Sequence, residues 1–116
     1  MIDSKPKYLH GVFAFTGTGY DKPALLSEKL TYRVPGDKRS QLIYMRAGNS
    51  CSELLYLLLM RDGAPMRYFP IGAKSAEHVS LALVEDIFPE TRLELFFAAP
   101  HGAQGTLVID FGLMEI

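Results

Sequence analysis

The chain has 116 residues, of which 48% are hydrophobic and 22% are charged, and this fits one domain spanning 1–116 and excludes a disordered protein. Twelve basic and thirteen acidic residues give a net charge of −1, a balance that excludes the basic field on which nucleic-acid binding relies. No apolar run approaches the ~18 residues of a membrane helix. The charge balance and the short apolar runs together indicate that neither nucleic acid nor a membrane is a partner.

Glycine and proline residues interrupt short apolar runs about every 8–12 residues, a spacing typical of an all-β sandwich or barrel. The segment 1–7 is expected to be a flexible N-terminus. Strands are predicted at 8–16, 30–34, 41–46, 53–61, 66–71, 78–84, 92–98 and 106–116. A short helical turn is predicted at 23–29, because proline suits the first helical position. The predicted fold class is therefore all-β, a single antiparallel β-sandwich of seven or eight strands.

One hairpin is specified by its turn residues. Asp62 and Gly63 form a pair typical of tight hairpin turns, because both positions tolerate a positive φ. The apolar segments on either side, 54–60 and 66–71, are therefore expected to pair antiparallel.

The segment 78–84 is open to two interpretations. As a strand it alternates between two faces, whereas as a helix it would be capped by Ser75. The strand is favoured because Gly72 and Pro89 leave little room for a full-length helix.

Three segments are apolar on both faces, although a sandwich strand normally alternates between core and solvent. They are 54–60, 96–99 and 107–109. Either a loop or the helical turn covers the outer side of such a strand, or another subunit covers it. The second is favoured, because a large apolar surface on a small domain usually marks an interaction site, and it predicts a homo-oligomer. The residues expected in this interface are Leu54, Tyr56, Leu58, Met60 and Phe96.

The residues that carry metal or nucleophilic chemistry are scattered. His10, His78, His101 and Cys51 lack the close spacing by which one element presents two metal ligands. No triad, nucleophile elbow or phosphate loop is visible, so no cofactor, no metal and no enzymatic activity is expected. Cys51 is expected to be a half-buried small residue. As the only cysteine it fits a reducing, cytoplasmic compartment.

Asp110 interrupts the apolar strand predicted at 106–116. A carboxylate in such a place usually needs an arginine or a backbone donor, which makes Asp110 a candidate functional residue. The favoured interpretation is an aspartate on a solvent-facing position of the sheet.

A polar cluster forms if the strands at 41–46, 54–61 and 66–71 are neighbours. Its members are Tyr44 and the five residues expected to bind a ligand, Arg46, Asn49, Arg61, Arg67 and Tyr68. Arginine suits carboxylates, phosphates or sugar hydroxyls, and tyrosine offers a stacking face, so the cluster predicts a site for a carbohydrate or an anionic metabolite. In the favoured alternative, these arginines pair with surface carboxylates, where ion pairs contribute little. The candidate carboxylates are Glu53, Asp62, Glu77 and Glu85.

The layout of roughly half of the chain, from Tyr44 to Pro100, supports the same fold. It runs through Ala47-Gly48-Asn49, Arg61-Asp62-Gly63-Ala64-Pro65, a tyrosine-containing strand, His78-Val79 and Glu85-Asp86. This layout resembles the sensory rhodopsin transducer family, small β-sandwich proteins that assemble as tetramers. The resemblance implies a β-sandwich and an oligomer, and it assigns no site residue, rhodopsin partner or DNA role to this chain.

The function that the sequence favours is a non-catalytic protein-interaction or assembly module. Its expected partners are further copies of itself and, in addition, another protein. The alternative is a small-molecule binding protein for a carbohydrate or an anionic metabolite, which would use the polar cluster defined above.

Overall fold

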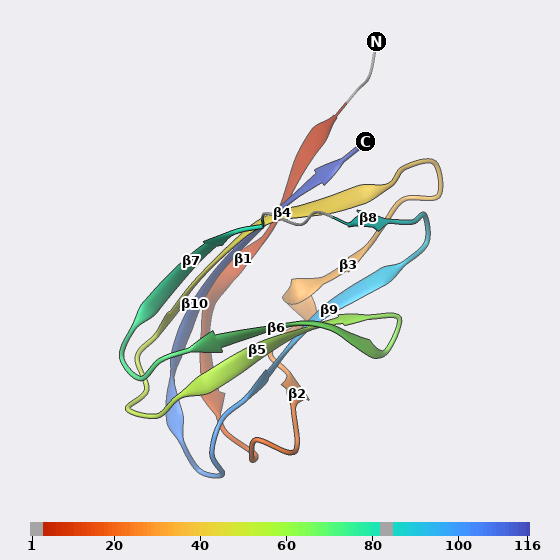
Figure 1. Cartoon of the computed structure of the whole chain (residues 1–116). Coiled ribbons are helices and arrows are strands. Elements are labelled where there is room, and N and C mark those ends of the chain that lie inside the picture. Colours follow the sequence, from red (N-terminus) through yellow and green to blue (C-terminus); the bar gives the residue numbers. More distant parts are fainter. Residues whose placement is uncertain (1–3, 82–84) are drawn as a thin grey trace.

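Ten strands form two antiparallel sheets that pack face to face in the computed structural model, whose described residues are 4–81 and 85–116 (Figure 1). Sheet A contains, in spatial order, β1 (Lys5–Thr16), β10 (Gln104–Glu115), β4 (Ser40–Asn49) and β7 (Ala76–Ser80), with β8 (Asp86–Ile87) also paired to β4. Sheet B contains β2 (Ala24–Leu25), β9 (Arg92–Ala98), β5 (Leu55–Arg61) and β6 (Ala64–Ile71), with β3 (Thr31–Arg33) also paired to β9. The predicted all-β sandwich is therefore confirmed.

The helical part of the described chain is one 3₁₀ turn, η1 (Glu28–Leu30). Ser27 caps it by accepting a hydrogen bond from the backbone N–H of Lys29 at 3.2 Å. The prediction of a helical turn at 23–29 is wrong for its first half, because β2 pairs with β9 there. No helix within residues 4–81 and 85–116 is long and apolar enough to cross a membrane.

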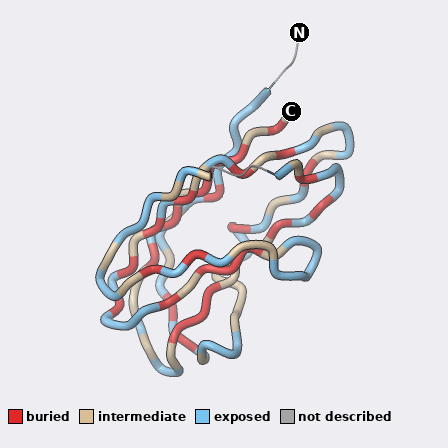
Figure 2. Tube along the Cα trace, viewed as in Figure 1, coloured by how far each residue is buried: buried red, intermediate tan, exposed pale blue. Residues whose placement is uncertain are grey.

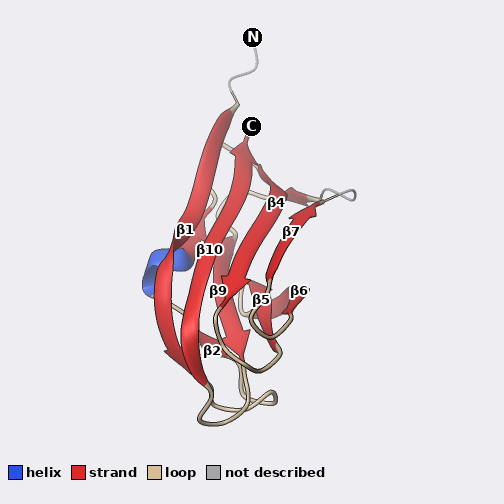
Figure 3. Ribbon diagram, turned by 90° about the vertical axis from the view of Figure 1, so that its left-hand side faces the viewer, coloured by secondary structure: helices blue, strands red, loops and turns tan. Residues whose placement is uncertain are grey.

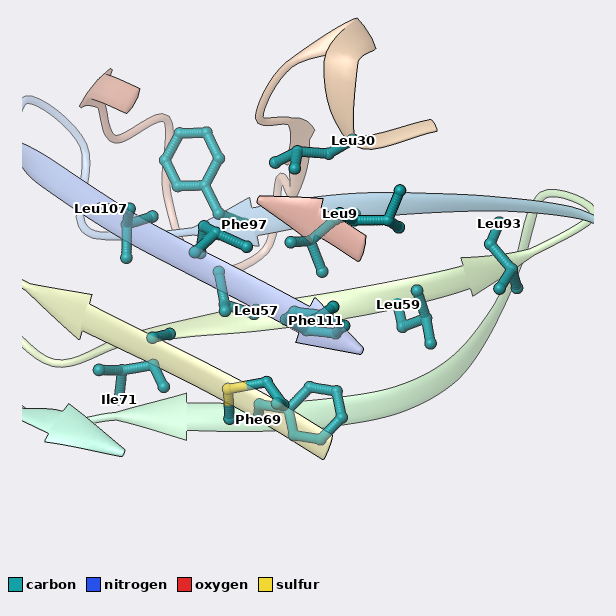
Figure 4. Close-up of a cluster of buried hydrophobic side chains, with 14 of the residues drawn as sticks. Leu9, Leu30, Leu57, Leu59, Phe69, Ile71, Leu93, Phe97, Leu107 and Phe111 are labelled. Atoms are coloured by element: carbon teal, nitrogen blue, oxygen red, sulfur yellow. The ribbon is translucent and has the colours of Figure 1, made fainter. Parts of the chain in front are cut away.

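The core lies between the sheets, where buried and exposed residues alternate along the strands (Figure 2). Along β10, Leu107, Ile109, Phe111 and Leu113 are buried, as the alternation of the sequence indicates. Phe111 meets Phe69 of sheet B edge to face, with 5.5 Å between ring centroids (Figure 4). Burying side chains of this size contributes about 1.5–3 kcal/mol each, so this shared layer is the main source of stability.

The β5–β6 hairpin forms at the predicted turn. Asp62 has φ 49° and Gly63 has φ 80°, the positive values that a tight two-residue turn requires. The two strands pair antiparallel, with one shift of register between Leu59 and Met60. The predicted pairing of these segments is confirmed.

Other boundaries differ from the prediction. Residues 5–7, expected to belong to a flexible segment, form the start of β1 and pair with the end of β10. The segment 78–84 begins as a strand, since β7 covers its first three residues, and 82–84 lies outside the described residues. The two-residue strands β2 and β8 were not predicted, because two residues are too few to show a periodicity.

The three strands on which the predicted polar cluster depends do not share one sheet. β4 pairs with β10 and β7, whereas β5 and β6 belong to sheet B. Figure 3 shows β1, β10, β4 and β7 side by side in sheet A. Alternation along a strand determines which face is buried but does not determine which strand lies beside it, and this is why the condition for the cluster could not be settled from the sequence.

A buried hydrogen bond joins the two sheets near the chain termini. The Tyr32 hydroxyl of β3 donates to Glu115 Oε2 of β10 at 2.5 Å, and Glu115 is almost fully buried. Burial and the hydrogen bond to the Glu115 carboxylate raise the pKa of Tyr32 well above its usual range. The tyrosine therefore stays protonated and supplies the donor that a buried carboxylate needs.

Candidate functional site

The outer face of sheet B is apolar across three strands, in line with the apolar segments noted in the sequence. Two rows of side chains cross β9, β5 and β6 in register. The rows are Phe96–Leu58–Tyr68 and Ala98–Tyr56–Pro70. Neither row contains a charged residue, so the part of the face that they form can be covered without removing a charge from water.

One end of this face carries a group of side chains that we call the tyrosine patch: Tyr20, Leu54, Tyr56, Tyr68 and Pro70. Tyr56 lies between the other two rings. It stacks on Tyr20, with centroids 6.5 Å apart and an interplanar angle of 19°, and it is tilted against Tyr68 at 5.6 Å. The patch lines an open concavity of about 320 Å³.

The loop between β1 and β2 brings Tyr20 over the sheet. The Tyr20 hydroxyl donates to the carbonyl of Leu54 at 2.6 Å, and the Tyr56 hydroxyl donates to the carbonyl of Tyr20 at 2.6 Å. Gly19 allows this path, because its φ of 116° favours glycine, and its N–H donates to the carbonyl of Ala99 at 2.8 Å. Two crossed hydrogen bonds thus hold the loop on the patch.

The internal hydrogen bonds decide what the patch offers to a partner. The hydroxyls of Tyr20 and Tyr56 both donate within the molecule, so these residues present mainly ring faces and edges to the outside. Burial raises the pKa of Tyr56, and the neighbouring Tyr68 and Asp21 raise it further, so the ring stays neutral. The patch is suited to an apolar partner surface more than to a strongly polar ligand.

The five residues predicted for an interface all lie on or beside this face. Leu54 and Tyr56 belong to the tyrosine patch, and Met60 and Phe96 are half-buried on the same face. Leu58 differs, since only 3% of its surface is exposed although it points away from the core. Its cross-strand neighbours are large, so they shield it within the chain.

Cover by the chain's own loop therefore explains part of the excess of apolar residues. The chain's own loop covers part of the face through Tyr20, whereas Tyr68 remains 59% exposed. Tyr20 is not among the residues predicted from the sequence, because strand periodicity gives no direction for a loop residue. Pro70 is not among them either, although its position two residues after Tyr68 on one strand places it on the same face.

The predicted polar cluster is not assembled. Arg46 lies on the outer face of sheet A, and Tyr68 lies on the outer face of sheet B. Arg61 ends β5 beside the hairpin turn, where it pairs with Glu85 at 3.3 Å, as the surface-pair alternative predicts. Arg67 is half-buried on β6, opposite Leu59. The arrangement around Arg46, Arg61 and Tyr68 therefore does not converge on one ligand.

Asn49, the remaining member of that cluster, has a structural role. Its Nδ2 donates to the carbonyls of Glu53 and Gly72, both at 3.1 Å, and its Oδ1 accepts from the backbone N–H of Cys51 at 2.9 Å. The side chain is buried, so these three bonds fasten the 49–53 turn and leave it little capacity for a ligand.

Asp110 lies on the outer face of sheet A with the arginine partner that its position requires. Arg46 Nη2 donates to Asp110 Oδ2 at 2.5 Å, and the Tyr44 hydroxyl donates to Asp110 Oδ1 at 3.0 Å. The Arg46 guanidinium also lies over the Tyr44 ring at 5.2 Å. The hydrogen bond to Asp110 raises the pKa of Arg46, and burial with the same carboxylate raises the pKa of Tyr44.

The histidines and the cysteine remain apart. His10 and His78 lie on β1 and β7, at opposite edges of sheet A, and His101 lies in the turn before β10. Cys51 is fully buried, a more complete burial than the sequence predicts. Across residues 4–81 and 85–116, no group of three histidine, cysteine, aspartate or glutamate side chains is placed to hold a metal ion.

No protein-family profile and no curated protein sequence matches the chain. Among solved structures, the chain is similar to the insecticidal delta-endotoxin Cry8Ea1 from Bacillus thuringiensis, with a TM-score of 0.51 and 10% identity over 89% of this chain. It is also similar to an exo-beta-1,3-galactanase from Phanerochaete chrysosporium, with a TM-score of 0.39 and 10% identity over 93% of this chain. The chain spans 19% and 29% of those two proteins, and the likeness to the endotoxin shows the sandwich fold alone.

Proposed function

We propose that this protein is a non-catalytic assembly module that forms a homo-oligomer through the outer face of sheet B. The observation that carries the proposal is the uncharged character of both rows that cross this face, with Tyr68 and Leu54 exposed at one end. An apolar face of this kind is stabilised by removal from water at about 25 cal/mol per Å². The resemblance to an oligomeric family of small β-sandwich proteins favours the same conclusion.

A second copy of the chain fits this face better than a charged partner. In a symmetric pair, each residue of the patch would meet the patch of the other copy, so an uncharged face meets an uncharged face. A partner with charged groups would lose their hydration without gaining an opposite charge. The patch itself is therefore the surface that complements it best.

The edge of sheet B favours contact through the face over strand addition. β6 is an edge strand, and it contains Pro65 and Pro70, which cannot donate backbone hydrogen bonds to an added strand. Assembly through the side chains of the face avoids this restriction. A cytoplasmic location completes the proposal, since the single, buried Cys51 fits a reducing compartment.

Sedimentation velocity of the full chain tests the proposal. The unsubstituted protein is expected to sediment above the monomer mass at micromolar concentration, and Tyr68→Glu or Leu54→Glu is expected to return it to a monomer. Val12→Glu is the matched control, because Val12 is 69% exposed on the outer face of sheet A.

Circular dichroism should show that all three variants keep the strand content of the parent. A parent that sediments as a monomer would contradict the proposal. The proposal would also be contradicted if Val12→Glu lowered the sedimenting mass while neither Tyr68→Glu nor Leu54→Glu did.

A further inference from the structure

A groove crosses the outer face of sheet A, on the opposite side of the sandwich from the tyrosine patch. Its volume is about 440 Å³, within the range of small-molecule sites. Two rows of side chains in register line it. One row is Val108, Gly48 and Ala76, and the other is Asp110, Arg46 and His78. The groove therefore has an apolar floor beside a polar wall.

Gly48 in the floor has no internal reason to be glycine. Its φ lies outside the left-handed region, and a Cβ built there would meet only the Val108 Cβ, at an ordinary 3.9 Å. Gly112 in the same sheet is different, because a Cβ there would overlap the Tyr44 ring. Glycine within a strand weakens the strand, and it often marks a place where a ligand or another backbone approaches closely. The missing side chain at Gly48 keeps the floor of the groove open.

The polar wall is preorganised. Asp110 is held by Arg46 on one oxygen and by Tyr44 on the other, and the Tyr44 ring is in turn packed edge to face against His78 at 6.2 Å. An ionised carboxylate has about four acceptor positions, so Asp110 can still accept hydrogen bonds from a ligand. Arg46 keeps further N–H donors beyond the one that it gives to Asp110.

The charges of the wall argue against an ionic ligand. Arg46 is balanced by Asp110, and Glu77 also lines the groove, so an anion would meet no excess of positive charge. A cation would have to compete with Arg46 for Asp110. A neutral group that donates to Asp110 and accepts from Arg46 satisfies both without displacing their contact.

We propose that this groove binds a neutral sugar ring, with its C–H face on Gly48, Ala76 and Val108 and its hydroxyls bonded to Asp110 and Arg46. A sugar ring carries both the apolar face and the hydroxyl groups that this arrangement requires, since a hydroxyl donates and accepts. The site lies on the face that the proposed homo-oligomer leaves open, so it is independent of that assembly.

Titration of the uniformly ¹⁵N-labelled full chain with D-glucose, D-mannose and D-galactose, followed by two-dimensional NMR, tests this site. At least one sugar is expected to give saturable shifts at the amides of Gly48, Ala76 and Val108. Asp110→Asn is expected to raise the Kd for that sugar about tenfold, the effect of losing one charge-assisted hydrogen bond.

Gly48→Leu is expected to abolish the shifts, because its side chain would fill the groove while the space above Gly48 lets the strand keep its fold. Gly48→Ala, which adds one methyl group, is the milder variant and is expected to weaken sugar binding. It replaces Gly48→Leu in the test if the leucine disturbs the spectrum of the whole protein. Tyr68→Glu is the control outside the groove, and it should leave sugar binding unchanged even if it dissociates the oligomer.

Three outcomes would overturn the proposal. The first is the absence of saturable shifts with every sugar. The second is that sodium sulfate or sodium citrate perturbs the groove whereas the sugars do not, which would make it an anion site. The third is that the same amides shift with protein concentration alone, which would make the groove a contact between copies of the chain.

Discussion

The two outer faces of the sandwich are built from the same kind of strand but differ in their central rows. On sheet B the row is Phe96, Leu58 and Tyr68, and it is uncharged, with the central leucine covered by the aromatic side chains on either side. On sheet A the row crosses four strands as His10, Asp110, Arg46 and His78. The row on sheet B is uncharged, like the side chains of the core. The row on sheet A is polar and contains the ion pair between Asp110 and Arg46.

This difference shows that exposure and direction are separate properties of a strand residue. Leu58 points away from the core and is nevertheless 3% exposed, whereas Val108 points away from the core on sheet A and is 51% exposed. Large neighbours on adjacent strands cover the leucine, while the valine lies between Gly48 and the exposed Val12 and gains less cover. Some outward-pointing side chains of sheet B are therefore buried like core residues, whereas Val108 on the outer face of sheet A remains exposed to solvent.

Truncation of Leu58 and of Val108 should show the largest difference between the two faces in the free energy of unfolding that is lost. Leu58→Ala is expected to lower the free energy of unfolding by about 2–4 kcal/mol, because it leaves a cavity among large side chains. Val108→Ala, the matched change on sheet A, is expected to cost less than about 1 kcal/mol. Urea denaturation followed by circular dichroism measures both, and equal losses would show that the faces do not differ in this way.

Gly48 and Gly112 of sheet A sharpen the comparison within one face. Gly112→Ala is expected to lower the free energy of unfolding by about 1–3 kcal/mol, because its Cβ would overlap the Tyr44 ring. Gly48→Ala is expected to raise it by about 0.5–1 kcal/mol, since a strand residue with a side chain loses less backbone freedom on folding. Thermal unfolding of the pair checks the prediction, and a destabilised Gly48→Ala would indicate an internal role for that glycine.

The junction of the two sheets offers an effect that depends on pH. The pKa of Tyr32 is raised in the folded chain, whereas in the unfolded chain a tyrosine titrates near pH 10. The folded state therefore holds this proton more tightly, so its stabilising contribution is complete below about pH 10 and is lost as the pH rises above that value.

Tyr32→Phe should accordingly cost about 1–3 kcal/mol at neutral pH, because the nearly buried Glu115 carboxylate loses this donor, and should flatten the loss of stability at alkaline pH. Denaturation curves measured on both sides of pH 10 check this, with Tyr8→Phe as an exposed control. A variant that loses stability with pH as steeply as the parent would show that Tyr32 does not carry the effect.

Much of the fold was predictable from local pattern. Alternation identifies Leu107, Ile109, Phe111 and Leu113 as one buried face of β10, because successive side chains of a strand point in opposite directions. Asp62 and Gly63 specify the β5–β6 hairpin, because their conformations restrict the chain to a tight turn. Two of the three apolar segments, 54–60 and 96–99, likewise fall on the sheet with the apolar outer face, whereas 107–109 lies on β10 of sheet A.

The tertiary structure alone decided which distant strands pair and which side chains therefore meet. Arg46 reaches Asp110 because β4 pairs with β10, a contact between residues far apart in the chain that no local pattern encodes. The same pairing separates Arg46 from Arg61 and Tyr68, and hydrogen bonds of a loop place Tyr20 on the tyrosine patch. The sequence by itself determined the faces of the strands through their period of two, whereas the neighbours on each face depend on how both sheets close around one core.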